Sequence, residues 1–174
     1  MTENELREKV RKVIELGKQI FVFATVDDEG RPHSRYMGVL DIAPDYSAFF
    51  LACETDSEKV HDVVQNPHSQ LLFATPDFLQ VATVSGKAEM VESAERKREF
   101  WEANPVLAGY FASPDDAEFG MIRFVPEYAE YLDLNEGYHT TRVEWGKGEG
   151  GSGKWEVGSV KNEEGSRGDA ETRR

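Results

Sequence analysis

The sequence predicts a mainly β protein, an antiparallel barrel that is closed or nearly closed and carries its helices on the outside. Three observations lead to this prediction. About seven segments are rich in β-branched and aromatic residues, which is typical of strands. Most of these segments follow one another through short turns, which implies antiparallel pairing. Only about three segments have the periodicity and the end signals of helices.

The expected strands are separated by turn and breaker residues. An acidic turn at 27–30 joins the first two strands into a hairpin. The third strand is expected to pair with the second, across the turn at 43–45. Gly86 lies inside the fifth strand and predicts a bulge or bend, whereas Pro126 is expected to separate the last two. The predicted strands are 19–26, 31–42, 48–53, 69–75, 78–91, 119–125 and 127–134.

The first helix is predicted at residues 3–16. Thr2 and Glu5 have the spacing of a capping box, and Gly17 is expected to close the helix as a C-cap. Apolar residues recur on one face at Leu6, Val10, Val13 and Ile14.

Two further helices are predicted. Ser57 opens a short helix over 57–65, which stops before Pro67 because proline disfavours helical geometry in the preceding residue. Ser93 caps the other helix, which runs from 94 to 104 and ends before a second proline.

Composition predicts one cytoplasmic domain. The 174 residues are 39% apolar, and no apolar run approaches the roughly 20 residues that a membrane helix needs. The N-terminal M-T-E-N-E-L-R-E-K lacks the apolar centre of a signal peptide. A single cysteine excludes an internal disulfide and fits a reducing compartment.

Charge separates the chain into a body and a tail. The net charge is −13, and residues 146–174 hold six basic and six acidic residues, so the body at 1–145 carries the whole −13. Eight of the 29 tail residues are glycine, which predicts a flexible tail. A body this acidic repels nucleic acid and anionic membrane, so neither is an expected partner.

The stretch 33–59 predicts an anion site. Arg35 and Lys59 stand at its two ends, and Ser57 begins a helix whose first N–H groups have no partners within the helix. A helix N-terminus, a guanidinium and an ammonium together suit the phosphate of a small cofactor. Hydrogen-bonding side chains lie between the two cations, at Ser34, Tyr36, Cys53, Thr55 and Ser57.

Each of these residues also has a plainer interpretation. Arg35 and Lys59 can be surface residues, Ser57 can be only an N-cap, and Cys53 can be only a small buried hydrophobe. The four histidines have no metal-ligand spacing, so no metal site is expected. The chain contains no G-x-S-x-G or P-loop motif. The spacing G-x-G-x-x-G occurs only in the glycine-rich stretch 146–153, which lacks the strand–helix context of a phosphate-binding loop.

Four motifs stand in order over about residues 5–135: F-A-T-V-D-D-E-G-R-P-H-S-R-Y-M, S-E-K-V-H-D-V-V-Q-N-P, V-S-G-K-A-E-M-V and R-F-V-P-E-Y-A-E-Y-L-D. Together they resemble the flavin-binding split barrels related to pyridoxamine 5'-phosphate oxidase, and in particular the bacterial general stress protein branch. The resemblance implies a split antiparallel β-barrel of about seven strands with flanking helices, and a homodimer with FMN at the subunit interface.

The resemblance also implies roles for single residues. Arg35 and Lys59 would bind the FMN phosphate, with Ser57 assisting. The ribityl chain and the isoalloxazine ring would run along Tyr36, Met37, Gly38 and Val39. Ala52 and Cys53 would complete the cofactor site.

The sequence departs from the oxidase pattern at several positions. Glu58 replaces a second basic residue, Gln80 is one position from the flavin-contacting glutamine, and Leu132 replaces a tryptophan. The segment N-E-G-Y-H-T-T-R replaces the substrate-binding run of the oxidase. These differences argue against oxidation of pyridoxamine phosphate itself.

Three functions therefore remain in view. The first is an FMN-dependent oxidoreductase acting on an unidentified small molecule, in which no residue stands out as an acid or base. The second is a stress protein that stores or senses flavin without turnover. The third is a barrel of the same kind that binds deazaflavin or haem in the same cleft.

Overall fold

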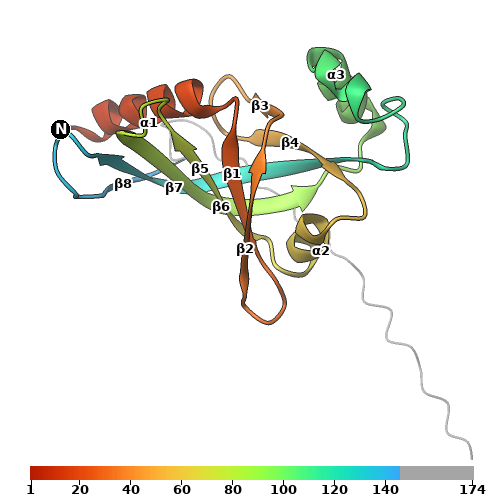
Figure 1. Cartoon of the computed structure of the whole chain (residues 1–174), viewed down its shortest axis with the longest axis horizontal. Helices are drawn as coiled ribbons and strands as arrows, with labels where there is room; N and C mark the ends of the chain where they lie inside the picture. The colour runs from red at the N-terminus through yellow and green to blue at the C-terminus, as the bar shows by residue number, and fades with distance from the viewer. Residues whose placement is uncertain (146–174) are drawn as a thin grey trace, which may run out of the picture.

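The computed structural model describes residues 1–145, which form one eight-stranded antiparallel sheet with helices packed against it (Figure 1). The elements in chain order are α1 (Glu3–Gly17), β1 (Phe21–Val26), β2 (Pro32–Met37), β3 (Leu40–Ile42), β4 (Phe49–Glu54), α2 (Glu58–Gln65), β5 (His68–Ala74), β6 (Gln80–Met90), α3 (Ala94–Ala103), the 3-10 helix η1 (Pro105–Gly109), β7 (Phe119–Asp133) and β8 (Thr141–Glu144).

The sheet is a barrel with an open seam. The strand order is β2-β1-β5-β6-β7-β4-β3, with β8 added to β7. Strands β2 and β3 occupy the two ends of this order, yet only Gly38 and Val39 separate them in the chain. The sheet therefore has to curl until its two ends approach each other. This arrangement confirms the predicted split antiparallel β-barrel, mainly β with flanking helices.

Strand 48–53 was expected to pair with the whole segment 31–42, and this is wrong for the first half of that segment. Only β3 pairs with β4, whereas β2 pairs with β1 in the hairpin that projects from the sheet beside α2 (Figure 1). The chain changes its place in the barrel at Gly38 and Val39, so the two halves of the predicted strand have different partners.

Helix α1 forms as its sequence predicts. The Thr2 side chain accepts from the Glu5 N–H, and the Glu5 carboxylate accepts from the Thr2 N–H. The predicted C-cap role of Gly17 is wrong, because Gly17 is the last helical residue and Lys18 follows it in right-handed geometry. Gly17 lies against β5, where an added Cβ would come within 2.6 Å of the Ala74 carbonyl oxygen. Close packing, not a left-handed turn, therefore requires glycine here.

Strand β7 is one continuous strand, so the predicted break at Pro126 is wrong. Its 15 residues run unbroken from Phe119 to Asp133. The part from Ile122 onward pairs with β6 on one side, and the other side pairs first with β4 and then with β8. Proline has no N–H to donate to a ladder. The register shifts between Ser85 and Gly86, directly opposite Pro126, which confirms the predicted bulge at Gly86. The bulge thus accommodates the proline within the sheet.

Strand β8 was not predicted, and it closes the described part of the chain. It pairs with Tyr128–Tyr131 of β7 and leads to Trp145, whose side chain is buried. The Trp145 indole N–H donates to the Tyr46 carbonyl oxygen at 2.9 Å, and the two rings meet edge to face at 6.3 Å. The body therefore ends on a packed aromatic contact.

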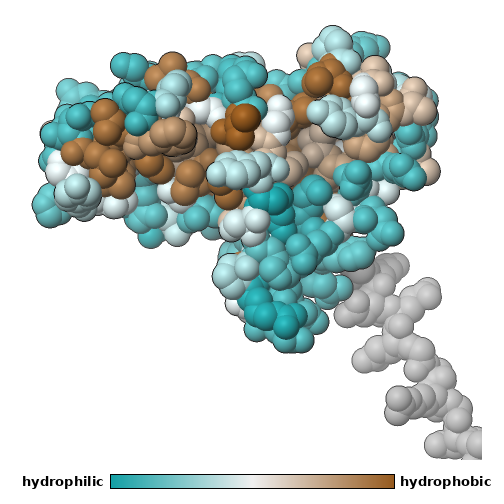
Figure 2. Space-filling view, viewed as in Figure 1, coloured by the Kyte–Doolittle hydropathy of each residue, from teal (hydrophilic) through white to brown (hydrophobic). Residues whose placement is uncertain are grey.

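Two hydrophobic clusters hold the layers together. The main cluster lies inside the curl and takes the apolar faces of α1 and α2. The second lies beneath α3 and η1, on the other face of β4 and β7. The projecting end of the β1–β2 hairpin is almost entirely hydrophilic on the visible surface (Figure 2). Large buried side chains of the main cluster are Phe21, Phe23, Phe49, Leu71, Phe73 and Phe124.

The predicted flexible tail at 146–174 lies outside the described residues. Within residues 1–145, no helix combines the length and the apolar character needed to cross a bilayer.

Gly86 gives a direct test of the β6–β7 bulge. Gly86→Ala places a Cβ against the Val125 carbonyl oxygen and within 2.9 Å of the Pro126 Cα. We expect this substitution to lower the free energy of unfolding by about 3 kcal/mol, because backbone atoms cannot move aside. Gly109→Ala is the control, since a Cβ added there would meet no other part of the described chain within 4 Å. Urea denaturation that shows equal losses for both variants would contradict this role.

Candidate functional site

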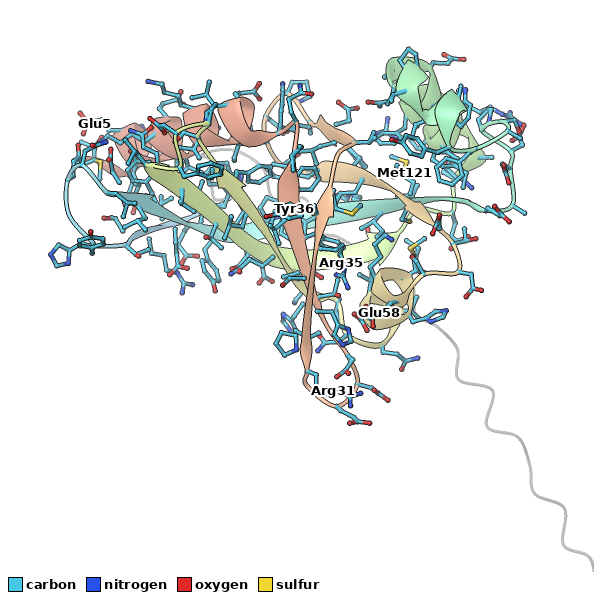
Figure 3. The ribbon with its side chains drawn as sticks, in the orientation of Figure 1. Glu5, Arg31, Arg35, Tyr36, Glu58 and Met121 are labelled. Atoms are coloured by element: carbon cyan, nitrogen blue, oxygen red, sulfur yellow. The ribbon has the colours of Figure 1, made fainter. Side chains whose placement is uncertain are left out.

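The candidate site lies where β2, the end of β4 and the start of α2 meet. Arg35 extends from β2 toward α2, and its Nη2 lies 3.5 Å from Glu58 Oε2 and 3.8 Å from Asp62 Oδ2 (Figure 3). Glu58 is the first residue of α2. The structure therefore brings Arg35 to the first turn of the helix that carries Lys59.

Arg35 is partly held by the protein itself. Its Nη1 donates to the Thr25 hydroxyl at 2.7 Å and to the Phe23 carbonyl oxygen at 3.3 Å. Its Nη2 is shielded from solvent and has no hydrogen-bond partner within the described residues, although both α2 carboxylates lie nearby. A guanidinium with one nitrogen fixed and the other unbonded can still accept an anionic ligand.

Asp62 is the central acid of the site and is buried. It accepts from the Thr25 hydroxyl at 2.6 Å and from His33 Nδ1 at 2.9 Å, both through Oδ2. Burial acts to raise the pKa of Asp62, but the hydrogen bonds from Thr25 and His33 and the nearby charges outweigh it and leave that pKa lowered. Asp62 is therefore a carboxylate at neutral pH, and it ties the β1–β2 hairpin to α2.

The start of α2 has unused hydrogen-bonding capacity. Ser57 occupies the predicted N-cap position, but its hydroxyl donates to the Glu54 carbonyl oxygen at 2.7 Å and does not cap the helix. The N–H groups of Val60 and His61 both bond the Ser57 carbonyl oxygen, so the unused N–H groups are those of Glu58 and Lys59, which have no partner within the described residues. Lys59, on the same first turn, is half-buried and makes no ion pair or hydrogen bond within residues 1–145.

The predicted ring-binding residues follow the open seam. Tyr36 is 78% exposed on β2, whereas Met37 packs against the main cluster. Gly38 is exposed between the strands, and Val39 packs against the second cluster. These four residues therefore pass from one edge of the barrel to the other, and only part of them faces solvent.

The structure separates the two predicted residues of β4. Ala52 packs against the second cluster, while Cys53 is 4% exposed in the main cluster on the opposite face. Burial raises the pKa of the Cys53 thiol to about 12, although the charges of Lys59 and Lys97 oppose the shift. Cys53 is therefore a core residue in this chain, and only Ala52 shares a face with Val39.

Gln80 has a structural role. Its amide donates to Asp133 Oδ2 at 2.8 Å, and the same carboxylate accepts from the Tyr131 hydroxyl at 3.1 Å. The hydrogen bond from Gln80 is the main reason that the pKa of Asp133 is lowered. The Gln80 amide therefore links the start of β6 to the end of β7.

Sequence reasoning missed Thr25, His33 and Asp62. The hairpin register pairs Thr25 with His33 across β1 and β2, and Asp62 lies one helical turn after Glu58. The sequence contains all three residues at these spacings, but they meet only because α2 packs on β1. Asp62 adds a buried negative charge beside Arg35, so the site is more acidic than the two predicted cations indicate.

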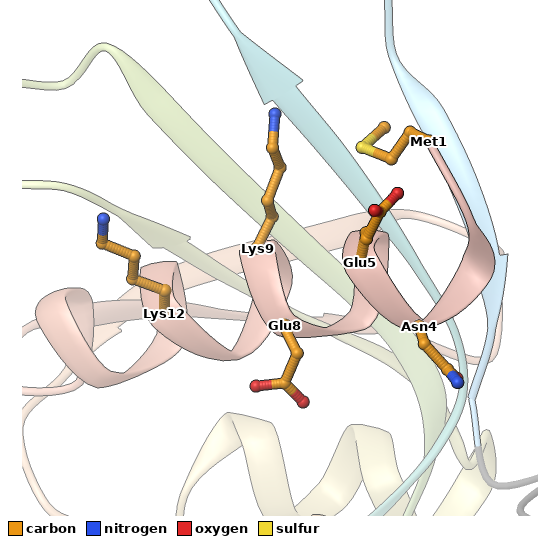
Figure 4. A pocket seen from close by; sticks show the side chains of 6 residues that line it. All are labelled: Met1, Asn4, Glu5, Glu8, Lys9 and Lys12. Carbon is orange, nitrogen blue, oxygen red and sulfur yellow. The ribbon is translucent and has the colours of Figure 1, made fainter.

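A large groove on the described residues lies elsewhere. It follows the outer face of α1 and contains none of the predicted site residues (Figure 4). No group of three histidine, cysteine or acidic side chains within residues 1–145 is arranged to hold a metal ion. The groove is lined by Met1, Asn4, Glu5, Glu8, Lys9 and Lys12.

Known proteins share this sequence pattern and this fold. The family described as pyridoxamine 5'-phosphate oxidase matches residues 6–133. A pyridoxine/pyridoxamine 5'-phosphate oxidase from Janthinobacterium sp. (strain Marseille) is 29% identical over 127 residues. That match covers 71% of this chain and 58% of the oxidase, so the chain spans less than two thirds of that relative.

Two solved structures show the same barrel. General stress protein 26 from Bacillus anthracis has a TM-score of 0.63 at 24% identity, covering 80% of this chain and 99% of that one. A pyridoxamine 5'-phosphate oxidase-related, FMN binding protein from Nostoc punctiforme has a TM-score of 0.61 at 16% identity, covering 80% and 87%. With the family match over most of the body, these findings confirm the resemblance: the chain belongs to the pyridoxamine 5'-phosphate oxidase-like family.

Proposed function

We propose that this protein binds FMN between β2, β4 and the start of α2, and that it is an oxidoreductase acting on an unidentified small molecule as a homodimer. The observation that carries the proposal is the meeting of Arg35 with the first turn of α2. Arg35 Nη2 makes no hydrogen bond within the described residues, although the carboxylates of Glu58 and Asp62 lie 3.5 and 3.8 Å away, and the Lys59 side chain has no ion-pair partner within residues 1–145.

The phosphate of FMN fits these groups chemically. It offers oxygens that accept from a guanidinium, an ammonium and the free N–H groups of a helix N-terminus. FMN would supply the redox chemistry, and the protein would supply binding and orientation. The buried thiol of Cys53 does not act as a redox partner in this proposal, because its raised pKa keeps it protonated.

Local charge decides whether the phosphate binds. Charges more than about 8 Å away are largely screened at physiological salt, so the net −13 of the body matters less than the nearest side chains. Arg35 and Lys59 favour the phosphate, whereas Glu58 and Asp62 oppose it. A bound phosphate therefore has to take Arg35 from the two carboxylates that now flank it.

A second copy of the chain would cover the outer face of the sheet. A row of half-buried apolar side chains shares this face from β1 to β7, as the strand register shows. These residues belong to neither hydrophobic cluster of the described chain. Apolar side chains grouped on a sheet face that the described chain leaves uncovered are typical of an interface. The row consists of Val22, Leu72, Val81 and Leu132.

The absorption spectrum of the purified protein, loaded with FMN where needed, tests the cofactor. We expect flavin bands, and FMN in the mass spectrum of the released cofactor. Haem or deazaflavin bands would replace this proposal by the third function considered above. Reduction by NAD(P)H with turnover of an acceptor supports an oxidoreductase, whereas tight FMN binding without reduction supports flavin storage or sensing.

Variants at the cations test the phosphate assignment. A hydrogen bond to a charged group contributes about 1.5–3 kcal/mol, so Arg35→Ala or Lys59→Ala should weaken FMN roughly 10- to 150-fold. Riboflavin lacks the phosphate, so its affinity should hardly change. Glu58→Gln removes an opposing charge and should tighten FMN alone.

Fluorescence titration of both flavins measures these effects. Lys87→Ala is the matched control, because this lysine is exposed on β6 and pairs with Glu127, away from the site. We expect it to bind both flavins as the unaltered protein does. Equal losses of FMN and riboflavin in the Arg35 and Lys59 variants would show that these residues support the fold and not the phosphate.

The dimer has its own test. Light scattering should give twice the chain mass of 19.6 kDa. Leu72→Glu places a charge in the apolar row and should yield monomers with weakened flavin binding. Leu16→Glu is the control, since Leu16 is exposed on α1 and lies outside the row. A monomer that holds FMN as tightly as the dimer would contradict a site shared between subunits.

A further inference from the structure

His33 lies between the β1–β2 hairpin and α2, and three carboxylates surround its ring. Its Nδ1 is 2.9 Å from Asp62 Oδ2 and 3.7 Å from Glu58 Oε1, and its Nε2 is 3.9 Å from Asp27 Oδ2. Because a carboxylate only accepts hydrogen bonds, Nδ1 carries the hydrogen in the neutral ring. Any added proton therefore goes to Nε2, on the side of Asp27.

The two carboxylates of α2 face both His33 and Arg35. Asp62 Oδ2 is 2.9 Å from the histidine and 3.8 Å from the guanidinium, and Glu58 is within 3.7 Å of both residues. When His33 is neutral, Arg35 is the nearest cation to this acidic pair. When His33 is protonated, a second cation shares the pair.

We propose that His33 sets how strongly this site holds a phosphate. The protonated ring neutralises part of the charge on Glu58 and Asp62 and leaves Arg35 available to the phosphate. The neutral ring leaves Arg35 facing both carboxylates, which then compete with the phosphate. This inference rests on the proposed FMN site, and it makes His33 a positioning residue that acts through Arg35.

The remaining charges around His33 agree with this role. Asp27 already forms an ion pair with Arg31, whose Nε lies 2.7 Å from its carboxylate. The protonated His33 ring therefore mainly offsets the negative charge of Glu58 and Asp62. The hydrogen bond to Asp62 outweighs the effect of burial and, with the charges of Glu58 and Asp27, raises the pKa of His33. The pKa of the His33 ring is therefore higher than that of an ordinary histidine, and the ring keeps its proton to a higher pH.

The direction of the pH effect follows from linkage. A phosphate that prefers the protonated ring must lose affinity as pH rises through the pKa of His33. The FMN phosphate itself acts the other way, since it gains its second charge near pH 6 and then binds cations more strongly. Above about pH 7 the phosphate is mostly dianionic, so a fall in FMN affinity above this pH comes from groups of the protein and not from the phosphate.

The experiment compares FMN and riboflavin from about pH 7 to about pH 9, by fluorescence titration of the full chain. For the unaltered protein, we expect the preference for FMN over riboflavin to fall about tenfold for each unit by which bound FMN raises the His33 pKa. His33→Gln removes the titrating proton and should hold a constant preference over this range. His139→Gln, which alters an exposed histidine between β7 and β8, should behave like the unaltered protein.

A second measurement does not depend on the variant folding. NMR titration of the His33 ring in the unaltered protein should show a higher pKa with FMN bound than with riboflavin bound. An equal pKa in the two complexes, or the same pH dependence in His33→Gln, would overturn the role of His33 while leaving the FMN site in place. Failure of both flavins to bind at every pH would overturn the site itself.

Discussion

Gly38 and Val39 alone connect the two ends of the eight-stranded sheet, and this short link constrains the rest of the fold. Strands β2 and β3 can occupy opposite ends of the order only if the sheet curls. The curl encloses the aromatic core and gives α1 and α2 their packing surface. It also leaves a seam, and the residues proposed to bind FMN lie along that seam and beside it. The position of the proposed site therefore follows from the open seam of the barrel.

Features set by neighbouring residues were predictable from the sequence, and features set by distant partners were not. The capping box of α1 and the bulge at Gly86 are local and were predicted correctly. The rule that proline ends a strand failed at Pro126, because the bulge opposite accommodates it. Strand β8 has only four residues, too few to show a clear alternation.

The candidate site divides in the same way. Arg35 and the start of α2 were predicted to meet, because a helix N-terminus and a strand-borne cation are visible in the sequence. Their acidic surroundings were not, since His33 and Asp62 are 29 positions apart and meet only when α2 packs on the hairpin. The hydrogen bonds from Arg35 to Thr25 and Phe23 hold its guanidinium in place beside the α2 carboxylates. Selectivity among anions would arise here from competition with the protein's own carboxylates.

The burial of Cys53 bears on how such a protein would withstand oxidants. A thiol with a pKa of about 12 is almost wholly protonated at neutral pH, and the thiolate is the form that peroxides attack. Cys53 is the only cysteine of the chain and lies in the main cluster, on the strand that pairs with β7. The described body thus offers no exposed sulfur nucleophile through which two molecules could become cross-linked. In the flavoprotein proposed here, redox chemistry would take place on the cofactor and not on this sulfhydryl group.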